Sequence, residues 1–559
     1  MKNLVIFFII GFLLASCTPT TKKVEKDLSN FIQQHQEKVE PLLKETNLAY
    51  WNASITGKKE DYDRYEKLQL ELVNIYSNKE DFAELKKIKE SGKVEDPLLK
   101  RQLTIIYNDY LENQIDKQLL EQIVKLSTTV EKQFNTFRGK MDGQEVTDSF
   151  IREILKTETK NIGKRKKAWL ASKQVGEEVN ENLVKLVKLR NEAAHQLGFG
   201  NYYTMALTLR EQEEEELVKI FNELKELTDD PFRKLKDELD ETLSRRYGIK
   251  KEELRPWHYN DPFFQEAPTM EEIDLDKYYK GKNLEELVIK FYNSIALSIK
   301  DILERSDLYE KEGKNPHAYC TNIDRKGDVR VLANVKDNEQ WMETLLHEFG
   351  HGIYSKYINP ELPFFLRRYA HIFTTEAIAM LFGRLSRDPN WMRDILGLEE
   401  SEVEKIKQIV KKSLRIKQLI FARWTQVMFN FERELYKNPD QDLNNLWWDM
   451  VEKYQFVTRP ENRDKPDWAA KIHFTSAPVY YHNYMLGEML ASQLHNYITN
   501  NILHQSPASL SYVNNKEIGA YIKEKVLKPG ARYPWDEMIE RATGEPLTAK
   551  YFVQQFVEE

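Results

Sequence analysis

The chain has 559 residues, of which 41% are hydrophobic and 31% are charged. This apolar content supports a large folded core and excludes an intrinsically disordered chain. The formal net charge of −7 gives no sign of the basic surface that nucleic-acid binding requires. With only two cysteines in the chain, we expect core packing rather than disulfides to stabilise the fold.

The N-terminus has the pattern of a bacterial export signal. MKNLVIFFIIGFLLASC combines a short basic start, an apolar run too short to span a bilayer comfortably, and small residues before Cys17. Its ending LASC resembles a lipobox, which implies removal of residues 1–16, lipidation of Cys17 and a tether over residues 17–24. The alternative is an ordinary secretory signal with a chance cysteine. We therefore expect an exported lipoprotein anchored to the cell envelope, in the periplasm or at the cell surface, and a buried Cys320 without a disulfide partner.

Residues from about 24 to 246 predict a succession of amphipathic helices. Apolar residues recur at three- and four-residue spacing in segments such as QLLEQIVKLSTTVEKQF and NENLVKLVKLRNEAAHQLG. Pro256 and Pro262 then interrupt the helical pattern. We divide a single domain there into a first part, residues 25–250, and a second part, residues 251–559.

One stretch of the second part predicts extended structure. NPHAYCTNIDRKGDVRVLANV has a turn signal at residues 324–327 between two short runs, the second of which is rich in valine. Helical patterns resume after it and continue to the C-terminus. The sequence thus predicts a mainly α fold with a small β-sheet beside the motif that follows.

The segment WMETLLHEFGHGIYSKYI predicts a helix with two histidines on one face. His347 and His351 are four residues apart, so both imidazoles can bind one metal ion. Glu348 lies on the adjoining side, where its carboxylate can reach a water on the metal. A zinc ion with an open position lowers the pKa of its water to about 7, and a nearby carboxylate can take the proton as that water attacks a peptide carbonyl.

The motif has a simpler interpretation, a pair of core histidines on a packed helix. Gly350 and Gly352 weaken that interpretation, because each glycine costs up to about 1 kcal/mol inside a helix. Such a cost is better explained by the close approach of another element than by packing alone.

Glu376 is the candidate for a third metal ligand. It lies in TTEAIAMLFGRL, a run typical of a buried helix that Thr374 or Thr375 could cap. An unpaired carboxylate there would be very costly, which favours a metal partner. A glutamate in the first turn can also simply complement the helix dipole, so the residues alone leave both roles open.

HEFGH followed after 24 residues by the glutamate of TTEAIA resembles the gluzincin pattern of angiotensin-converting-enzyme-type and oligopeptidase F/thimet-type peptidases. Three further blocks resemble the first of these families: NLAYWNASIT, RKKAWLASKQVGEEVNENLVKLVKLRNEAAHQLGFGNYYTM, and PHAYC, which resembles its edge strand. The resemblance covers most of the mature chain. It implies a two-lobed helical zinc peptidase with a deep central groove, whose metal ligands are His347, His351 and Glu376.

The block AAKIHFTSAPVYYHNYMLGEM resembles the oxyanion-binding segment of both families. Its Lys-x-His portion is similar to the converting-enzyme type, whereas the spacing from His473 through Tyr480 and Tyr484 to Gly487 is similar to oligopeptidase F. Hydrogen-bond donors aimed at developing charge in a dry site contribute about 3 kcal/mol each. The resemblance implies that His473 and Tyr484 supply them, with Tyr480 as the competing tyrosine.

The resemblance also implies substrate-binding residues. His317 and the Ala318 backbone would pair with an extended peptide by strand addition. Lys471, with Tyr480, would hold the free C-terminal carboxylate of the substrate. If that carboxylate is held two residues from the zinc, the enzyme releases C-terminal dipeptides.

Two departures concern this carboxylate site and the activating chloride. The family's glutamine beside the lysine has no clear match, and the nearest segment is residues 256–259. The arginine that helps to bind chloride is absent, since Tyr481, His482 and Asn483 stand in its region. We therefore do not carry chloride activation over to this chain.

A third departure concerns the group that orients a metal ligand. Met380 replaces the aspartate that follows the third ligand in the family, so another group must orient His351. His371, a few residues before Glu376, is the candidate.

The sequence as a whole predicts zinc-dependent hydrolysis of short peptides, with release of C-terminal dipeptides and with the N-terminal helices as a lid over the groove. The alternatives are an endo-acting oligopeptidase of the oligopeptidase F/thimet type and a catalytically silent peptide-binding lipoprotein. The expected partners are short peptides and, through the lipid anchor, a membrane, but no nucleic acid.

Overall fold

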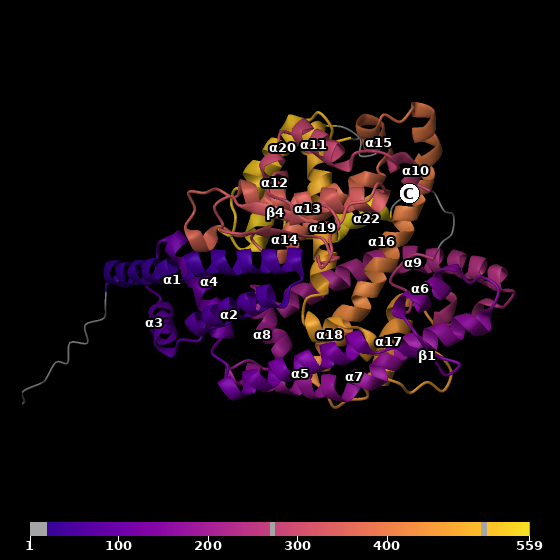
Figure 1. Cartoon of the computed structure of the whole chain (residues 1–559), viewed down its shortest axis with the longest axis horizontal. Helices are drawn as coiled ribbons and strands as arrows, with labels where there is room; N and C mark the ends of the chain where they lie inside the picture. Colours follow the sequence, from indigo (N-terminus) through magenta and orange to yellow (C-terminus); the bar gives the residue numbers. More distant parts are fainter. Residues whose placement is uncertain (1–19, 269–273, 505–510, 558–559) are drawn as a thin grey trace, which may run out of the picture.

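The computed structural model describes residues 20–268, 274–504 and 511–557, and these residues form a mainly helical protein, which confirms the predicted fold class (Figure 1). The first part of the chain supplies nine helices within the described residues: α1 (Thr21–Thr56), α2 (Lys59–Tyr76), α3 (Lys79–Glu90), α4 (Pro97–Glu112), α5 (Lys117–Thr136), α6 (Asp148–Thr157), α7 (Ile162–Gln196), α8 (Tyr202–Leu209) and α9 (Glu214–Tyr247). Helix α1 begins at Thr21, inside the segment expected to be a tether, and the Thr20 side chain accepts a hydrogen bond from the Lys23 N–H there. Residues 1–19, with Cys17 and the export signal, lie outside the described residues.

The second part of the chain is also built mostly of helices. They are α10 (Asp276–Tyr279), α11 (Leu284–Ser294), α12 (Lys300–Leu303), α13 (Glu339–Tyr357), α14 (Ile372–Gly383), α15 (Pro389–Leu396), α16 (Glu400–Lys437), α17 (Leu443–Gln455), α18 (His473–Ser476), α19 (His482–Tyr497), α20 (Lys516–Tyr521), α21 (Trp535–Thr543) and α22 (Lys550–Phe556). The two expected parts pack directly against each other. Helix α18 packs on α5, and α16 contacts both α7 and α9. In Figure 1 the 38-residue helix α16 runs from the upper group of helices into the lower one.

The strands of the described residues form two antiparallel hairpins. The expected hairpin pairs β3 (Tyr319–Asn322) with β4 (Val329–Leu332), in the register Tyr319 opposite Leu332. A second hairpin of β1 (Gly139–Met141) and β2 (Gln144–Val146) interrupts the first helical part, where we expected only helices. Its turn is Asp142–Gly143, both with positive φ, and this Asp-Gly pair is a hairpin signal that the helical periodicity around it obscured.

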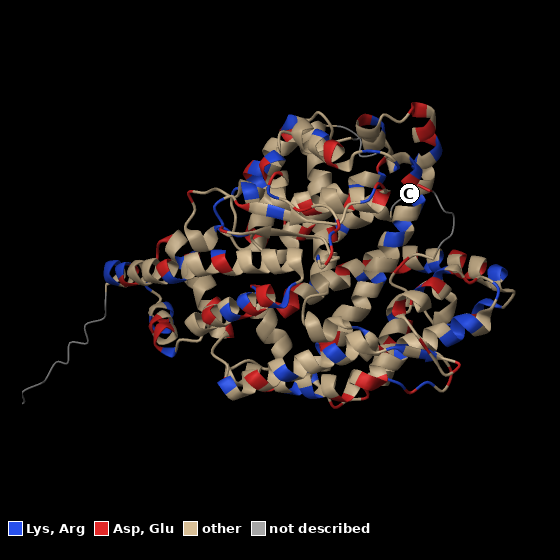
Figure 2. Cartoon of the chain, viewed as in Figure 1, with Lys and Arg blue, Asp and Glu red and all other residues tan. Residues whose placement is uncertain are grey.

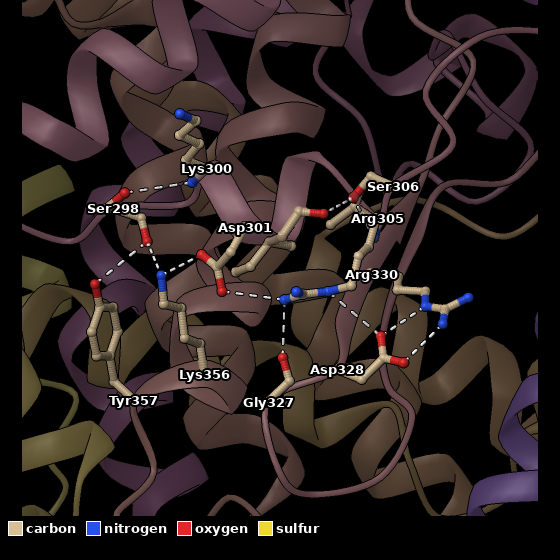
Figure 3. A network of polar contacts seen from close by, with 12 residues as sticks. Ser298, Lys300, Asp301, Arg305, Ser306, Gly327, Asp328, Arg330, Lys356 and Tyr357 are labelled. Atoms are coloured by element: carbon tan, nitrogen blue, oxygen red, sulfur yellow. Dashed lines mark hydrogen bonds and ion pairs between the residues drawn. The ribbon is translucent and has the colours of Figure 1, made fainter.

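The β3–β4 hairpin is fixed to the end of α13 by a network of ionic contacts (Figure 3). Lys356, in the last turn of α13, binds Asp301 of α12 and donates to the Ser298 carbonyl at 2.6 Å. Arg305 bridges Asp301 to Asp328 at the hairpin turn, with N···O distances of 3.2 and 3.6 Å. These ion pairs fix the hairpin next to α13, the helix that carries His347 and His351.

The hydrophobic core is continuous across both parts of the chain. One cluster of buried residues extends from Ile105 to Val557, and a second joins α1, α3 and α4 to Phe364 and Phe365 of the 3₁₀ helix η3 (Phe364–Leu366). Figure 2 shows acidic and basic residues interspersed along the helices of both parts. Within the described part of the chain, no helix is both long enough and apolar enough to cross a bilayer.

Candidate metal centre and active site

The structure brings the three predicted metal ligands together. His347 and His351 lie one turn apart on α13 with 3.2 Å between their Nε2 atoms, and Glu376 of α14 has its Oε2 3.6 Å and 3.8 Å from those nitrogens. Their potential ligand atoms all lie within 4.8 Å of one another, so these three described residues form a group that could hold a metal ion. Two imidazole nitrogens and one carboxylate oxygen that leave a position open are the donor set of a catalytic zinc site.

Glycine at helix crossings allows this convergence. A Cβ on Gly350 of α13 would lie 2.8 Å from the Ala379 Cα of α14, and one on Gly487 of α19 would lie 3.2 Å from the Glu376 Cβ. Gly352 likewise faces the Ile302 side chain at 3.2 Å. The helical glycines are thus explained by close approach of neighbouring elements, as their cost in the sequence led us to expect.

Burial sets the protonation of these groups in the protein without metal. It lowers the pKa of His347 to about 4 and that of His351 well below its usual value, so both imidazoles are neutral and able to bind a cation. Burial raises the pKa of Glu376 to about 7 and, together with the nearby Glu376 charge, that of Glu348 to about 8. A cation bound at Glu376 would lower the pKa of both buried carboxyls and release their protons. Two neighbouring buried acids therefore favour cation binding at this site.

Thr375, rather than His371, contacts the second histidine. The Thr375 hydroxyl lies 2.8 Å from His351 Nδ1, the nitrogen that stays free when Nε2 binds a metal. His371 instead caps α14, where its Nδ1 accepts a hydrogen bond from the Phe373 N–H at 3.3 Å. The expectation for His371 was therefore wrong, since the rotation of α14 turns the side chain directly before Glu376, and not the cap, toward α13.

A large groove approaches the candidate metal site at Met380, one turn of α14 after Glu376. Its cavity measures about 1320 Å³ and is lined by α9, α16, the segment around residue 265, and the block that contains His473 and Tyr484. Met380, which stands in place of the expected aspartate, also lines it. A volume of this size is sufficient for a peptide of several residues.

Of the predicted oxyanion-binding side chains, His473 and Tyr484 line this groove, and Tyr480 and Tyr484 lie close to Glu376. Tyr480 and Tyr484 contact each other with 5.3 Å between ring centroids, and the Glu376 charge raises the pKa of both hydroxyls beyond the effect of burial. Both phenols are therefore protonated donors. His473, whose pKa burial lowers to about 4, stacks edge-on against Tyr481 at 4.9 Å. Both tyrosines lie near Glu376, so either one remains a candidate oxyanion donor.

Lys471 has partners that the sequence did not reveal. Its ammonium donates to Gln265 Oε1 at 2.6 Å and lies 5.3 Å from the Tyr481 ring, whereas Tyr480, expected beside it, lies near Glu376. The rings of Phe263 and Trp424 complete the surroundings. An amide thus lies beside Lys471, but it comes from Gln265 rather than from residues 256–259, and in the sequence it is marked only as a polar residue after Pro-Phe-Phe.

The expected peptide-binding edge lies next to Glu348. His317 is exposed and Ala318 half-buried, and both directly precede β3. The Cys320 N–H of β3 donates to the Glu348 carboxylate. In the described residues β3 pairs with β4 alone, so no strand pairs with its other edge. Cys320 itself is half-buried rather than fully buried.

Comparison with known proteins matches residues 22–557 to the family described as angiotensin-converting enzyme. The chain is 23% identical to the angiotensin-converting enzyme-like protein Ace3 of Mus musculus, over 68% of this chain and 55% of that protein. It is 22% identical to thermostable carboxypeptidase 1 of Pyrococcus furiosus (43% and 51%) and 24% identical to oligoendopeptidase F of Lactococcus lactis subsp. cremoris (47% and 44%). The chain spans about half the length of the curated relatives it matches.

We expect Thr375→Val to weaken zinc binding by about 10- to 100-fold, because the isosteric methyl group cannot hydrogen-bond His351 Nδ1. Competition with a chromogenic chelator measures this affinity without any activity assay. Thr375→Ser keeps the hydroxyl and should retain tight binding. Equal affinities of the valine and serine variants would contradict the role of the hydroxyl.

Proposed function

This chain belongs to the angiotensin-converting enzyme family, and on that basis we propose that it is a zinc-dependent peptidase that hydrolyses short peptides. The observation that carries the proposal is the convergence of His347, His351 and Glu376 around one point, with the Glu348 carboxyl beside them. The cavity lined by Met380, one turn after Glu376, and by Tyr484 supplies room for a peptide. Helices α1 and α4, which contact the hairpin and η3, would act as the lid that limits entry to short, unfolded chains.

The chain's own residues account for proton transfer and charge stabilisation. Zinc bound by His347, His351 and Glu376 would supply Lewis acidity to the attacking water and to the substrate carbonyl. Glu348 takes the proton of the water and passes it to the leaving amine. His473 and one of Tyr480 or Tyr484 donate hydrogen bonds to the oxygen on which negative charge develops. The neutral phenols are suited to that task, since their raised pKa values keep the donor protons in place.

We propose that the enzyme releases C-terminal dipeptides, on the basis of a site that can bind a terminal carboxylate. The buried Lys471 ammonium contacts the amide of half-buried Gln265 and has no carboxylate directly bound to it among the described residues. A free peptide C-terminus is the complementary ligand. The alternative is endo-cleavage of the oligopeptidase F type, which needs no terminal carboxylate. A silent peptide-binding lipoprotein is disfavoured because the candidate ligands, base and oxyanion donors all occur together.

The open edge of β3 is the proposed binding site for the substrate backbone. An extended peptide that adds to this edge at His317 and Ala318 would lie alongside Glu348, which already accepts the Cys320 N–H. Strand addition recognises backbone groups rather than side chains, so it fits an enzyme that acts on many sequences.

We also propose that the protein is exported and anchored in a membrane through lipidated Cys17. The proposal is supported by the basic start, the apolar run and the LASC ending of residues 1–17. The described helices begin directly after this segment, at Thr21.

Glu348→Gln tests the hydrolytic mechanism. We expect the variant to bind stoichiometric zinc and to lose peptide hydrolysis by at least about 1000-fold, because an amide cannot accept the proton of the water. Metal analysis and a fluorogenic peptide assay measure the two properties. Glu343→Gln, the same change one turn and a half earlier on α13, serves as the control. Retained hydrolysis in Glu348→Gln would exclude the mechanism.

Lys471→Met tests recognition of the substrate C-terminus. For peptides with a free C-terminus we expect KM to rise by about 30-fold, the equivalent of about 2 kcal/mol for a charged hydrogen bond. Amidated peptides should be poor substrates of both proteins, and Lys465→Met, at an exposed position nearby, should change neither. Equal internal cleavage of free and amidated peptides by the wild type would establish the oligopeptidase alternative.

Cys17→Ser tests the anchor. In cells that process lipoproteins we expect this variant to incorporate no labelled fatty acid and to leave the membrane fraction, because serine offers no thiol for the acyl-glyceryl group. Cys320→Ser should remain labelled. Labelling that persists in Cys17→Ser would overturn the proposed anchor.

A further inference from the structure

Val479, in the loop between α18 and α19, has an unusual backbone. Its φ is 53° and its side chain is fully buried. The left-handed region is unfavourable for a β-branched residue, because the Cβ approaches the carbonyl oxygens, so such a residue persists only where its surroundings hold it. The next residue is Tyr480, one of the two candidate oxyanion donors.

Both peptide groups of Val479 are bound by charged side chains. Its N–H donates to Glu432 Oε1 at 2.8 Å, and its carbonyl accepts from Arg210 Nη1 at 2.8 Å. Glu432 comes from α16, and Arg210 follows α8. The clamp on Val479, formed by Glu432 and Arg210, therefore comes from two elements distant in sequence from the loop.

A further arginine holds the start of the same loop. Arg190 of α7 is buried and donates to the carbonyls of Phe474 at 2.9 Å and Thr475 at 2.7 Å. Arg190 thus binds the two residues that follow His473, and the clamp binds the residue that precedes Tyr480. His473 and Tyr480, two of the candidate oxyanion donors, thus adjoin backbone groups that charged side chains bind.

The burial of Glu432 is energetically costly. Only 3% of its surface is exposed, and burial raises the pKa of its carboxyl to about 7 although Arg190 and Arg210 lie near. A buried carboxyl of this kind is tolerated only where its interactions are needed. The interaction it makes is the hydrogen bond to the N–H of the left-handed residue.

We propose that Glu432 and Arg210 are positioning residues that hold Val479 in the left-handed conformation and thereby direct Tyr480 toward the metal centre. The two hydrogen bonds from Glu432 and Arg210 oppose the relaxation of Val479 to negative φ. The inference rests on the proposed function for its catalytic readout, but the coupling between Glu432 and Val479 can be measured without it.

The test compares Glu432→Leu, Val479→Gly and the double variant. Loss of the clamp lets the valine relax, so Glu432→Leu should lower kcat by about 100-fold with KM little changed, the pattern of a misplaced oxyanion donor. Glycine adopts positive φ without a side-chain penalty. Val479→Gly should therefore retain kcat within about threefold, and the double variant should recover at least about tenfold over Glu432→Leu.

Two further variants guard against trivial explanations. Arg210→Met removes the clamp from the carbonyl side and should show the same loss and the same rescue by Val479→Gly, which keeps the test valid if Glu432→Leu does not fold. Ala296→Gly relaxes another positive-φ residue, an exposed one at 59°, and should rescue neither variant. A double variant no more active than Glu432→Leu, or a Val479→Gly variant as impaired as Glu432→Leu, would overturn the proposal.

Hydrogen exchange separates this proposal from the proposed function. If the zinc-loaded wild type hydrolyses no peptide, the proposed function fails, and amide exchange over residues 477–484 then decides on the clamp. Exchange should be at least about tenfold faster in Glu432→Leu and should return toward the wild-type rate in the double variant. Unchanged exchange in Glu432→Leu would overturn the clamp itself.

Discussion

The spacing of α14 between α13 and α19 is the constraint on which the site depends. Gly350 lets α13 approach the backbone of α14, and Gly487 does the same for α19 on the other side. At this spacing Glu376 reaches the two histidines, Thr375 reaches His351 Nδ1, and Tyr484 on α19 lies near the third ligand. A Cβ at Gly350 would press on the α14 backbone, and one at Gly487 would press on the Glu376 side chain. The ligands are thus positioned by helix packing, which is stiffer than any loop.

Features that follow from local periodicity were predictable from the sequence. The four-residue spacing of His347 and His351, the helices around them and the β3–β4 hairpin each depend on a short run of residues. The residues alone left Glu376 between a ligand and a helix-dipole role, and only the family resemblance favoured the ligand, because its distance from the histidines depends on how two helices cross. The same resemblance placed His473 and Tyr484, which the structure finds around the groove beside the ligands.

Apart from the local β1–β2 hairpin, the contacts at the site that the sequence did not reveal depend on how separate elements pack. Thr375 contacts His351 because of the rotation of α14 about its axis, which periodicity does not set relative to another helix. Gln265 and Tyr481 meet at Lys471 from segments more than 200 positions apart. No motif marks such pairs, since each residue type is ordinary at its own position. The left-handed backbone of Val479 could not be predicted either, because valine favours extended backbone with negative φ.

The proposed binding of the substrate C-terminus by Lys471 would link substrate binding to proton uptake, because this ammonium is buried. Burial lowers the pKa of its ammonium to about 8, so near that pH a fraction of the free protein carries a neutral lysine. A carboxylate in contact with the nitrogen favours the charged form and raises this pKa again. Binding of a peptide C-terminus must then draw a proton from the solvent, and its measured enthalpy will include the ionisation heat of the buffer. Affinity should consequently decline as the medium becomes more alkaline than the pKa of the empty site, even where the peptide itself does not titrate.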